Sequence, residues 1–448
     1  MRRMRLTARI VQTLAFLALS SCGSSSVVEP GVQPPAASSN ARPNALHFVP
    51  LISFSGGTGG IDTLFSGIGG LAGLIGSAAA LYGTTFAGGD SSCTSSFSMN
   101  GCGVVYKLAP QSGSSSYQET VLYTFHGSDG AAPLGPLLID AAGNLYGTTY
   151  QGGKYGEGTV FELAPSGSSY VETVLHSFGK GDDGAYPHAG LIEAGGILYG
   201  TTIAGGRYSN AICKNSGGSP NGTCGTAFAV VAGTGKERVL HSFGSGNDGA
   251  SPFAGLVQAN GTLYGATDLG GTPTEFHLCG TVFSLSTTGS EHVIHRFTNT
   301  PNDGCNPFGR LIAINGTLYG TTCCGGTYFG AHREGSVYSL DIATGVEKVL
   351  HNFGNGHDGS EPQAALVELD GRLYGTTNIG GVHCKPLGCG TIFSLLPIGS
   401  QYRVEVRFRN GAKGHFPTDA LLALDGSLYG TTTSGGLHDL GTAFKLTP

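Results

Sequence analysis

A short motif, LYGTT or a close variant followed within a few residues by two glycines, recurs seven times along the 448-residue chain. Its intervals are 64, 53, 65, 55, 55 and 55 residues, measured between the tyrosines Tyr82, Tyr146, Tyr199, Tyr264, Tyr319, Tyr374 and Tyr429. A period of about 55 residues indicates an array of one supersecondary unit. Such units stack, because one of them alone cannot bury both of its apolar faces.

One complete unit, residues 349–400, shows what each copy contains. It has four short runs that resemble strands, VLHNF, AALVEL, RLYGTT and GTIFSL, and none is long or periodic enough for a helix. The DG pair between the second and third runs is a strong signal for a tight turn. Because all the connections are short, the pattern predicts a four-stranded antiparallel meander.

Four-stranded units of this length are typical of propeller blades, so the sequence predicts an all-β, seven-bladed β-propeller over residues 46–448. An open β-solenoid is the alternative, and it would need capping ends that we do not find. We expect the recurring residues to serve folding. Gly83 and Gly147 would let strands approach closely, the adjacent Leu and Tyr would fill the layer between blades, and the threonine pair would cap a turn.

The composition excludes several classes of protein. Glycine contributes 78 residues, and these sit at fixed places beside Val, Leu, Phe and Tyr, as expected for turns in packed strands. The net charge of −6 and the lack of a basic block argue against a nucleic-acid surface. We find no HExxH or GxSxG motif and no dinucleotide fingerprint between a strand and a helix.

The N-terminal residues have the features of an export signal. A basic MRRMR precedes the mostly apolar IVQTLAFLALS, and Leu19-Ser20-Ser21-Cys22 resembles the lipobox of bacterial lipoproteins. This resemblance implies a signal peptide at 1–21 and a lipidated Cys22, whereas an ordinary secretory signal is the alternative. Residues 22–45, rich in Ser and Pro, would form a tether. We expect a lipid anchor in the bacterial cell envelope, and Gly23 weakly favours the outer membrane or cell surface.

The pattern LYGTT-x-x-GG, a loop and then GTVF-x-L closely resembles the GloVer tandem repeat of bacterial envelope proteins described as choice-of-anchor proteins. The resemblance covers all seven units. Copy one departs in its first half, copy four has GATDLGG, and copy seven has AKGHFP in place of DGAxP. The resemblance implies an exported, anchored repeat protein, and it supplies neither an established activity nor catalytic residues.

Eleven cysteines in an exported chain indicate disulfides. Three pairs lie locally in loops that follow the GG pair: Cys93/Cys102, Cys213/Cys224 and Cys384/Cys389. A four-cysteine cluster is expected where the loops of copies four and five meet on one face: Cys279, Cys305, Cys323 and Cys324. We predict two bonds in this cluster, one of them joining the two copies. A strained vicinal bond and a zinc site are the alternatives.

Two sets of repeated side chains could bind a metal. Four histidines share one position in the first run of their copies: His176, His241, His295 and His351. Ile52, Tyr123 and Val406 occupy the same position elsewhere, which favours packing over a metal site in the central channel. Five aspartates precede glycine in the DGAxP segment: Asp129, Asp183, Asp248, Asp303 and Asp358. A turn role is sufficient for them, and calcium binding is the weaker alternative.

These features favour a binding or scaffolding propeller over an enzyme. The loops at 88–103, 205–225 and 381–390 vary most between copies, so we expect an unidentified protein or glycan to bind this disulfide-braced loop face. The first alternative is an envelope hydrolase or lyase for polysaccharide or peptide that uses loop residues such as Glu157, Glu275 or Glu334. The second is a purely structural surface module. We assign no catalytic residue and no cofactor, and we expect a monomeric ring that contacts the membrane through the lipid.

Overall fold

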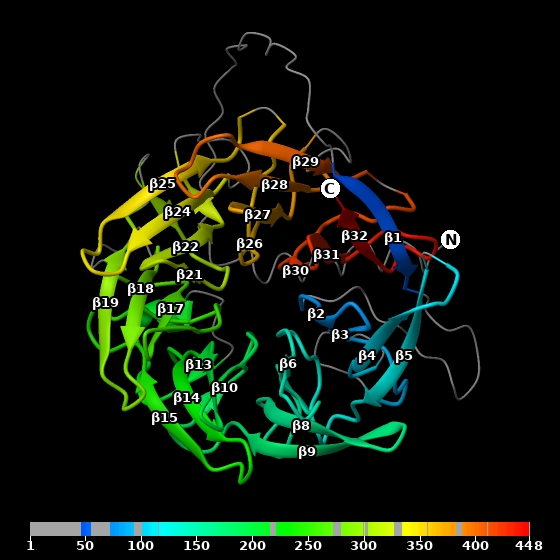
Figure 1. The fold of residues 1–448 in the computed structure, drawn as a ribbon. Coiled ribbons are helices and arrows are strands. Elements are labelled where there is room, and N and C mark those ends of the chain that lie inside the picture. Colours follow the sequence, from blue (N-terminus) through cyan, green and yellow to red (C-terminus); the bar gives the residue numbers. More distant parts are fainter. Residues whose placement is uncertain are drawn as a thin grey trace.

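The computed structural model describes residues 46–54, 72–93, 101–114, 116–215, 221–271, 279–298, 300, 303–326, 334–355, 357–381, 388–409 and 411–447. Seven four-stranded antiparallel sheets surround a central axis like the blades of a propeller (Figure 1). The helix α2 (Ala211–Asn215) is short, and no helix in the described ranges has the length and hydropathy needed to cross a membrane. The predicted seven-bladed β-propeller is confirmed.

In the first four blades the strands follow one another outward from the axis in sequence order. Blade 1 contains β2 (Ile75–Ser77), β3 (Ala80–Thr85), β4 (Val104–Pro110) and β5 (Tyr117–Thr124). Blade 2 contains β6 (Leu138–Ile139), β7 (Leu145–Thr149), β8 (Thr159–Ser166) and β9 (Ser169–Ser177). Blade 3 contains β11 (Ile192–Ala194), β12 (Ile197–Thr202), β14 (Thr226–Val231) and β15 (Glu237–Ser242). Blade 4 contains β16 (Val257–Ala259), β17 (Thr262–Thr267), β18 (Thr281–Leu285) and β19 (Glu291–Arg296).

The last three blades complete the ring. Blade 5 contains β21 (Ile312–Ile314), β22 (Thr317–Thr322), β24 (Ser336–Asp341) and β25 (Glu347–Asn352). Blade 6 contains β26 (Val367–Leu369), β27 (Arg372–Thr377), β28 (Thr391–Leu395) and β29 (Arg403–Arg407). Blade 7 contains β30 (Leu422–Leu424), β31 (Ser427–Thr432), β32 (Thr442–Thr447) and β1 (His47–Ser53). Two small sheets pair β10 (Gly184–Ala185) with β13 (Ala204–Gly205) and β20 (Gly304–Cys305) with β23 (Cys324–Gly325).

The first strand of the chain closes the ring. β1 pairs antiparallel with β32, from His47 opposite Thr447 to Ser53 opposite Thr442, and Figure 1 shows the blue and red strands side by side. Phe48 on β1 also stacks on Phe444, with ring centroids 5.0 Å apart. The two ends of the described chain therefore share one sheet, so the structure is a closed ring and not an open solenoid.

The sequence repeat and the blade are out of phase by one strand. The first run of a repeat, such as VLHNF at 349–353, forms the outer strand of one blade, and the second run forms the innermost strand of the next blade. The histidine-bearing first runs therefore lie at the periphery of the ring (Figure 1). The channel is instead bordered by the short second runs, such as β16 and β26.

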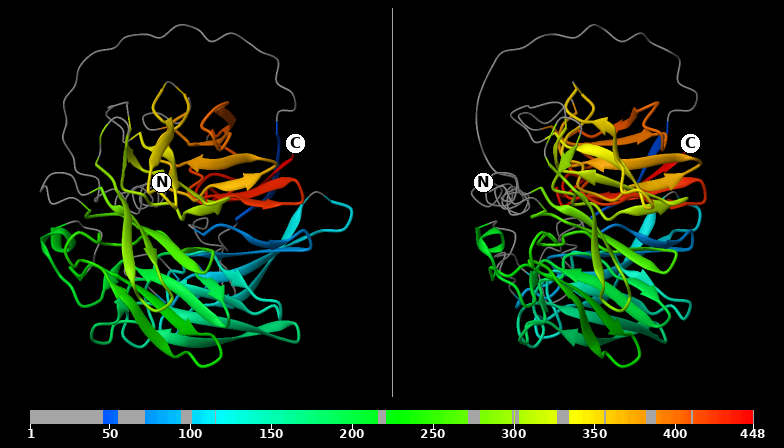
Figure 2. Two further views of the ribbon diagram at one scale, coloured as in Figure 1. Left: turned by 60° about the vertical axis from the view of Figure 1, so that its left-hand side comes forward. Right: turned by 90° about the vertical axis from the view of Figure 1, so that its left-hand side faces the viewer.

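The ring has two different faces. On one face, short turns join the first to the second strand of each blade, and the third to the fourth strand of blades 1 to 6. The described parts of the longer connections, between the second and third strands and from one blade to the next, lie on the other face, which we call the loop face. The helix α2 lies on the loop face and is visible as the green coil at one side of the ring in Figure 2. Gly184, in the connection from blade 2 to blade 3, pairs with Gly205, in the connection between the second and third strands of blade 3. The two kinds of connection therefore meet on the loop face.

The glycine of the LYGTT motif lies under an aromatic ring of its own blade. Gly265 on β17 pairs with Phe283 on β18, and a Cβ at Gly265 would be 2.5 Å from Phe283 Cζ and 2.9 Å from a Leu256 methyl carbon. A Cβ at Gly147 would likewise be 2.5 Å from Phe161 Cζ. The glycine is thus needed because the aromatic ring of the next strand occupies the space where a Cβ would lie. The expectation was that the glycine would let two strands approach closely, so the structure gives a more specific reason.

Replacing Gly265 by alanine is expected to lower the free energy of unfolding by about 1–3 kcal/mol, because an extra carbon overpacks a rigid core. Denaturant unfolding measures this loss. Gly233→Ala is the matched control, since a Cβ there meets nothing within 4 Å. Equal midpoints and slopes for the two variants would contradict the assigned role of Gly265.

The two threonines of the motif have different hydrogen-bonding roles. The second hydroxyl caps the turn as expected, since Thr149 Oγ1 donates to the Gln151 carbonyl at 2.9 Å. The first hydroxyl reaches the next blade, where Thr148 Oγ1 donates to the Ala189 carbonyl at 2.9 Å. Equivalent bonds between blades recur at Thr84–Pro133, Thr201–Ala254, Thr321–Ala364 and Thr376–Asp419. The motif therefore also links neighbouring blades, which the sequence analysis did not predict.

Candidate functional site

The four repeated histidines lie on the outer strands of blades 2 to 5, so they do not converge at the axis. Each imidazole instead contacts the aspartate of its own repeat. The Nε2 to carboxylate-oxygen distances are 2.9, 2.9, 3.3 and 3.0 Å for His176–Asp183, His241–Asp248, His295–Asp303 and His351–Asp358. The sequence placed both residue types correctly in the repeat but did not pair them.

The aspartates also hold the connection that follows each outer strand. Asp183 Oδ1 accepts a hydrogen bond from the Gly184 amide at 2.7 Å, and Asp248 Oδ1 accepts one from the Gly244 amide at 3.0 Å. Asp129, whose repeat has a tyrosine at the histidine position, accepts a bond from the Tyr123 hydroxyl at 2.7 Å and one from the His126 amide at 2.8 Å. The five candidate calcium ligands therefore occupy five successive places around the ring and do not form one shared site.

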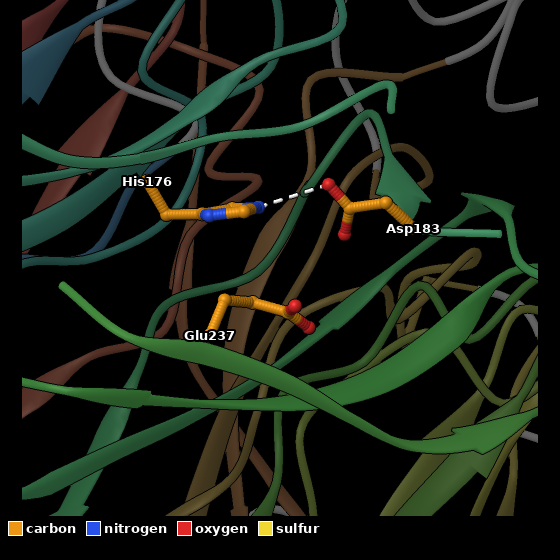
Figure 3. A group of neighbouring side chains, drawn as sticks. All are labelled: His176, Asp183 and Glu237. Atoms are coloured by element: carbon orange, nitrogen blue, oxygen red, sulfur yellow. Dashed lines mark hydrogen bonds and ion pairs between the residues drawn. The ribbon is translucent and has the colours of Figure 1, made fainter. Parts of the chain in front are cut away.

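A glutamate from the following blade completes some of these groups. Glu237 on β15 faces His176 and Asp183 of blade 2 (Figure 3), and one ligand-type atom of each lies within 4.8 Å of the others. His295, Asp303 and Glu347 form a second such group between blades 4 and 5. We call these two groups the junction clusters. The glutamate recurs four residues before the histidine position in five copies: Glu119, Glu172, Glu237, Glu291 and Glu347.

A β-bulge explains how side chains of one outer strand reach both neighbouring blades. In β15, His241 pairs with Ala227 but Val239 pairs with Phe228, which leaves Leu240 as an extra residue. Residues four apart in a regular strand share one face. The extra residue of the bulge reverses this alternation for the side chains that follow it. Glu237 therefore faces blade 2, while His241 is near Glu291 of blade 4.

Burial changes the protonation of these glutamates. Desolvation, with Asp183 nearby, raises the pKa of Glu237 to about 7, and His176 and Arg238 oppose the rise. Desolvation is also the main cause that raises the pKa of Glu347 to about 8. The Oε1 atom of each of these two side chains is buried and accepts no hydrogen bond from the described residues.

The junction cluster of blades 2 and 3 forms part of a pocket of about 880 Å³. This volume is within the range of small-molecule sites. The residues that line it include His176, Asp183, Glu237 and His241 from the outer strands and their connections, and Lys154, Tyr155, Lys180, Asp182, Arg207 and Tyr208 from the loop face.

Charged and aromatic side chains form the loop-face side of this pocket. Arg207 Nε lies 3.5 Å from Asp182 Oδ2, and both side chains are 70% exposed. Lys154 Nζ lies 5.3 Å from the centroid of the Tyr155 ring. Arg207 belongs to the 205–225 loop, one of the three variable loops expected to carry recognition. The pocket therefore lies beside one of the loops at which ligand binding was expected.

The disulfides brace the loop face. Two local bonds join Cys93 to Cys102 and Cys213 to Cys224, and a third bond, Cys279–Cys305, ties the β17–β18 loop of blade 4 to β20. Cys389 is also disulfide-bonded, while Cys22 and Cys384 lie outside the described residues.

The four-cysteine cluster forms as expected, because Cys279, Cys305, Cys323 and Cys324 pack in one apolar group. Of the two bonds predicted within it, Cys279–Cys305 joins the two copies, and Cys324 is also disulfide-bonded. The Sγ atoms of Cys323 and Cys324 are 2.9 Å apart, farther than the roughly 2.05 Å of a disulfide. The second predicted bond within the cluster therefore stays a prediction.

The loop glutamates considered for an enzyme do not meet. Glu157 and Glu334 hold the place before the last glycine of the loop, which is cysteine in four other copies, and they belong to blades 2 and 5. Burial raises the pKa of Glu157, next to Asp183, and raises that of Glu334 to about 7. Glu275 lies outside the described residues.

Several solved structures are similar in fold but distant in sequence. An oligogalacturonate lyase from Vibrio parahaemolyticus is 10% identical, with 77% of this chain and 83% of that chain covered, at a TM-score of 0.49. The β-propeller domain of the trilobed protease from Pyrococcus furiosus is 7% identical, with 83% and 91% covered, at a TM-score of 0.42. A chain of a nidogen–laminin complex is 13% identical, with 69% and 94% covered, at a TM-score of 0.39. No curated protein matches the sequence.

One family model matches the chain repeatedly, over residues 52–211, 91–330 and 279–448. These overlapping matches run from β1 to the end of the chain and include every copy of the LYGTT motif. The model describes the Gloeobacter/Verrucomicrobia repeat, for which GloVer is the short name. The resemblance noted in the motif is therefore confirmed, and the chain belongs to the Gloeobacter/Verrucomicrobia repeat family.

Proposed function

We propose that this chain is a binding propeller of the bacterial cell envelope, anchored through lipid at Cys22, and that it binds a glycan carrying carboxylate groups. The ligand would occupy the pocket between blades 2 and 3. The observation that supports this most is the group of exposed basic side chains at that pocket, Lys154, Lys180 and Arg207, beside the Tyr155 ring, which is 41% exposed.

These basic residues are particular to one place in the ring. Directly after the GG pair, copies two and three have Lys154 and Arg207, whereas the other copies have Asp90, Thr272, Thr327, Val382 and Leu437. A feature that the fold required would recur in every copy, as the glycines and threonines do. Lysine and arginine attract carboxylates, and an exposed tyrosine ring offers an apolar face to a sugar.

The ligand proposal is tested by titrating the purified protein with a uronic-acid oligosaccharide and with a neutral oligosaccharide of the same length, using calorimetry. We expect binding of the acidic oligosaccharide only, weakened by salt. The Lys154→Ala/Arg207→Ala variant should weaken it at least tenfold. Lys236→Ala, an exposed lysine in the turn between β14 and β15, is the control. Equal binding of both oligosaccharides, or an equal loss in the control, would overturn the proposal.

The anchor is tested separately. The lipobox-like segment before Cys22 and the basic, then apolar, N-terminus support it. Labelling of producing cells with a radioactive fatty acid should mark the protein, and Cys22→Ser should abolish the label. An unlabelled protein secreted in soluble form would favour the ordinary secretory signal.

Cleavage of the same glycan is a second candidate function. Glu237 lines the pocket beside His176 and Asp183, where its carboxyl group is placed to act as a general acid or base. Mass spectrometry of the incubated oligosaccharide distinguishes the two functions. Products that disappear in Glu237→Gln, while binding persists, would establish the enzyme instead of the binding protein.

A further inference from the structure

We propose that the two junction clusters, His176–Asp183–Glu237 and His295–Asp303–Glu347, bind a divalent transition-metal ion, which ties blade 2 to blade 3 and blade 4 to blade 5. This inference does not depend on the glycan, because each cluster would hold its ion without a ligand in the pocket. Figure 3 shows the first cluster, with the glutamate on one blade and the His–Asp pair on the other.

The donor atoms suit such an ion in type and spacing. Imidazole nitrogen together with two carboxylates favours Zn²⁺, Mn²⁺, Fe²⁺ or Co²⁺ over calcium, which prefers oxygen ligands alone. Two ligands bonded at about 2.1 Å and at right angles are about 3 Å apart. His176 Nε2 and Asp183 Oδ2 are 2.9 Å apart, and His295 Nε2 and Asp303 Oδ1 are 3.3 Å apart. The glutamate oxygen, within 4.8 Å of both, needs only a small inward movement.

The unsatisfied glutamate oxygen supports the proposal where a histidine and an aspartate lie close to it. Oε1 is buried without a donor among the described residues at all five repeated glutamates: Glu119, Glu172, Glu237, Glu291 and Glu347. At Glu237 and Glu347 alone among them, a histidine nitrogen and an aspartate oxygen lie within 4.8 Å of the glutamate oxygen. Arg238, adjacent to Glu237 in the chain, directs its guanidinium to the carbonyls of Thr287 and Thr288 instead. A buried carboxylate oxygen without a donor is costly. A cation shared with the neighbouring His–Asp pair would remove that cost.

The repeats supply natural controls, because some junctions lack one of the three ligands. Tyr123 stands in place of the histidine beside Asp129 and Glu172. Tyr402 stands in place of the glutamate beside His351, and its ring stacks on the imidazole at 3.7 Å. The junction of blades 3 and 4 has all three residue types, with His241 bonded to Asp248 and Glu291 near both. Among the described residues, however, the three ligand atoms lie within 4.8 Å of one another in the two junction clusters alone. The proposal therefore predicts two ions per chain.

The experiment is a titration of the full-length, disulfide-intact protein with Co²⁺ and with Zn²⁺ after removal of metals by a chelator. Calorimetry should give two sites. Glu237→Gln and Glu347→Gln should each weaken one site at least tenfold, and Glu172→Gln should leave both unchanged. Zn²⁺ should also raise the melting temperature of the unmodified protein, but not that of the Glu237→Gln/Glu347→Gln variant.

Three results would overturn the proposal. They are the absence of binding at 100 µM metal, a loss of sites in Glu172→Gln equal to that in Glu237→Gln, and a thiolate-to-cobalt absorption band that places the ion at cysteines. If Glu237→Gln does not fold, His176→Gln tests the same site from the other blade. Glycan binding by the metal-free protein is measured in parallel, so failure of the metal site leaves the proposed function separately testable.

Discussion

Replacing Glu119 by glutamine is expected to stabilise the metal-free ring by about 2–3 kcal/mol more at pH 8 than at pH 5. Glu119 lies on the outer strand β5, and desolvation alone raises its pKa to about 7. Its Oε1 is buried and accepts no hydrogen bond within the described part of the chain. The folded protein therefore keeps this proton up to about pH 7, whereas the unfolded chain loses it near pH 4.5.

The sign follows from this difference in proton binding. Between pH 4.5 and pH 7 the folded state holds one more proton than the unfolded state, so stability falls as the pH rises. The contribution is complete below pH 4.5 and is lost as the pH passes through 7. Glutamine removes the titration but keeps the shape, so the variant should gain most at pH 8.

The measurement is a pair of denaturant unfolding curves, at pH 5 and pH 8, for the original protein, Glu119→Gln and Glu193→Gln. Glu193 is an exposed glutamate and serves as the control. Comparison with the original protein is essential, because burial lowers the pKa of His188 to about 4 and this group acts in the opposite direction below pH 6.5. The effect of His188 is the same in the original protein and in the variant, so it cancels when their free energies of unfolding are subtracted. A pH-independent effect of Glu119→Gln would contradict the prediction.

The sequence was sufficient to predict the architecture, but it did not show which run of the repeat forms the first strand of a blade. A period of about 55 residues containing four β-like runs specifies blade size and number, whatever residue is chosen as the start of a unit. In a closed ring every starting point is equivalent until the ends of the chain are placed. The position of β1 beside β32 settles the phase, and it depends on pairing between residues almost 400 positions apart, which no local pattern encodes.

The candidate site was predicted only in part, for a local geometric reason. The histidines and aspartates stood out because they recur, yet their pairing depends on the turn between them. Glu237 and His241, four residues apart, should share a face in a regular strand. The bulge at Leu240 sends them to different neighbours. No glycine or other sequence signal marks a bulge at Leu240, so the proximity of Glu237 to His176 could not be predicted from the sequence.

Backbone conformation before proline is a second feature that the sequence did not predict. A residue before proline normally favours an extended conformation. Tyr186, which precedes Pro187, instead has φ of 57°, and equivalent residues in five other copies are similar: Ala132, Ser251, Asn306, Glu361 and Phe416. In this conformation the Tyr186 carbonyl accepts the Ile203 amide across the loop face, at 3.3 Å. Tertiary hydrogen bonding thus overrides the local preference.

Removing residues 46–54 is expected to cost the ring at least about 5 kcal/mol, which is comparable to the whole stability of a typical domain. The deletion removes β1 and leaves β32 as an open edge. Leu51 and Phe54 on the deleted segment are 4% and 0% exposed, and burial of each such side chain is worth roughly 1.5–3 kcal/mol. Phe48, stacked on Phe444, and the six residue pairs between β1 and β32 are lost with them.

The deleted protein should unfold at a much lower temperature and associate, because an uncovered strand edge pairs with other chains. Circular dichroism during heating and size-exclusion chromatography measure the two effects. A nine-residue deletion within the Ser/Pro-rich segment 22–45 is the control and should change neither. A synthetic peptide of residues 46–54 added in trans should restore part of the stability, since the missing strand makes its contacts through one sheet edge. An unchanged melting temperature after the deletion would mean that the first and last blades hold together without β1, and that closure is not what stabilises this ring.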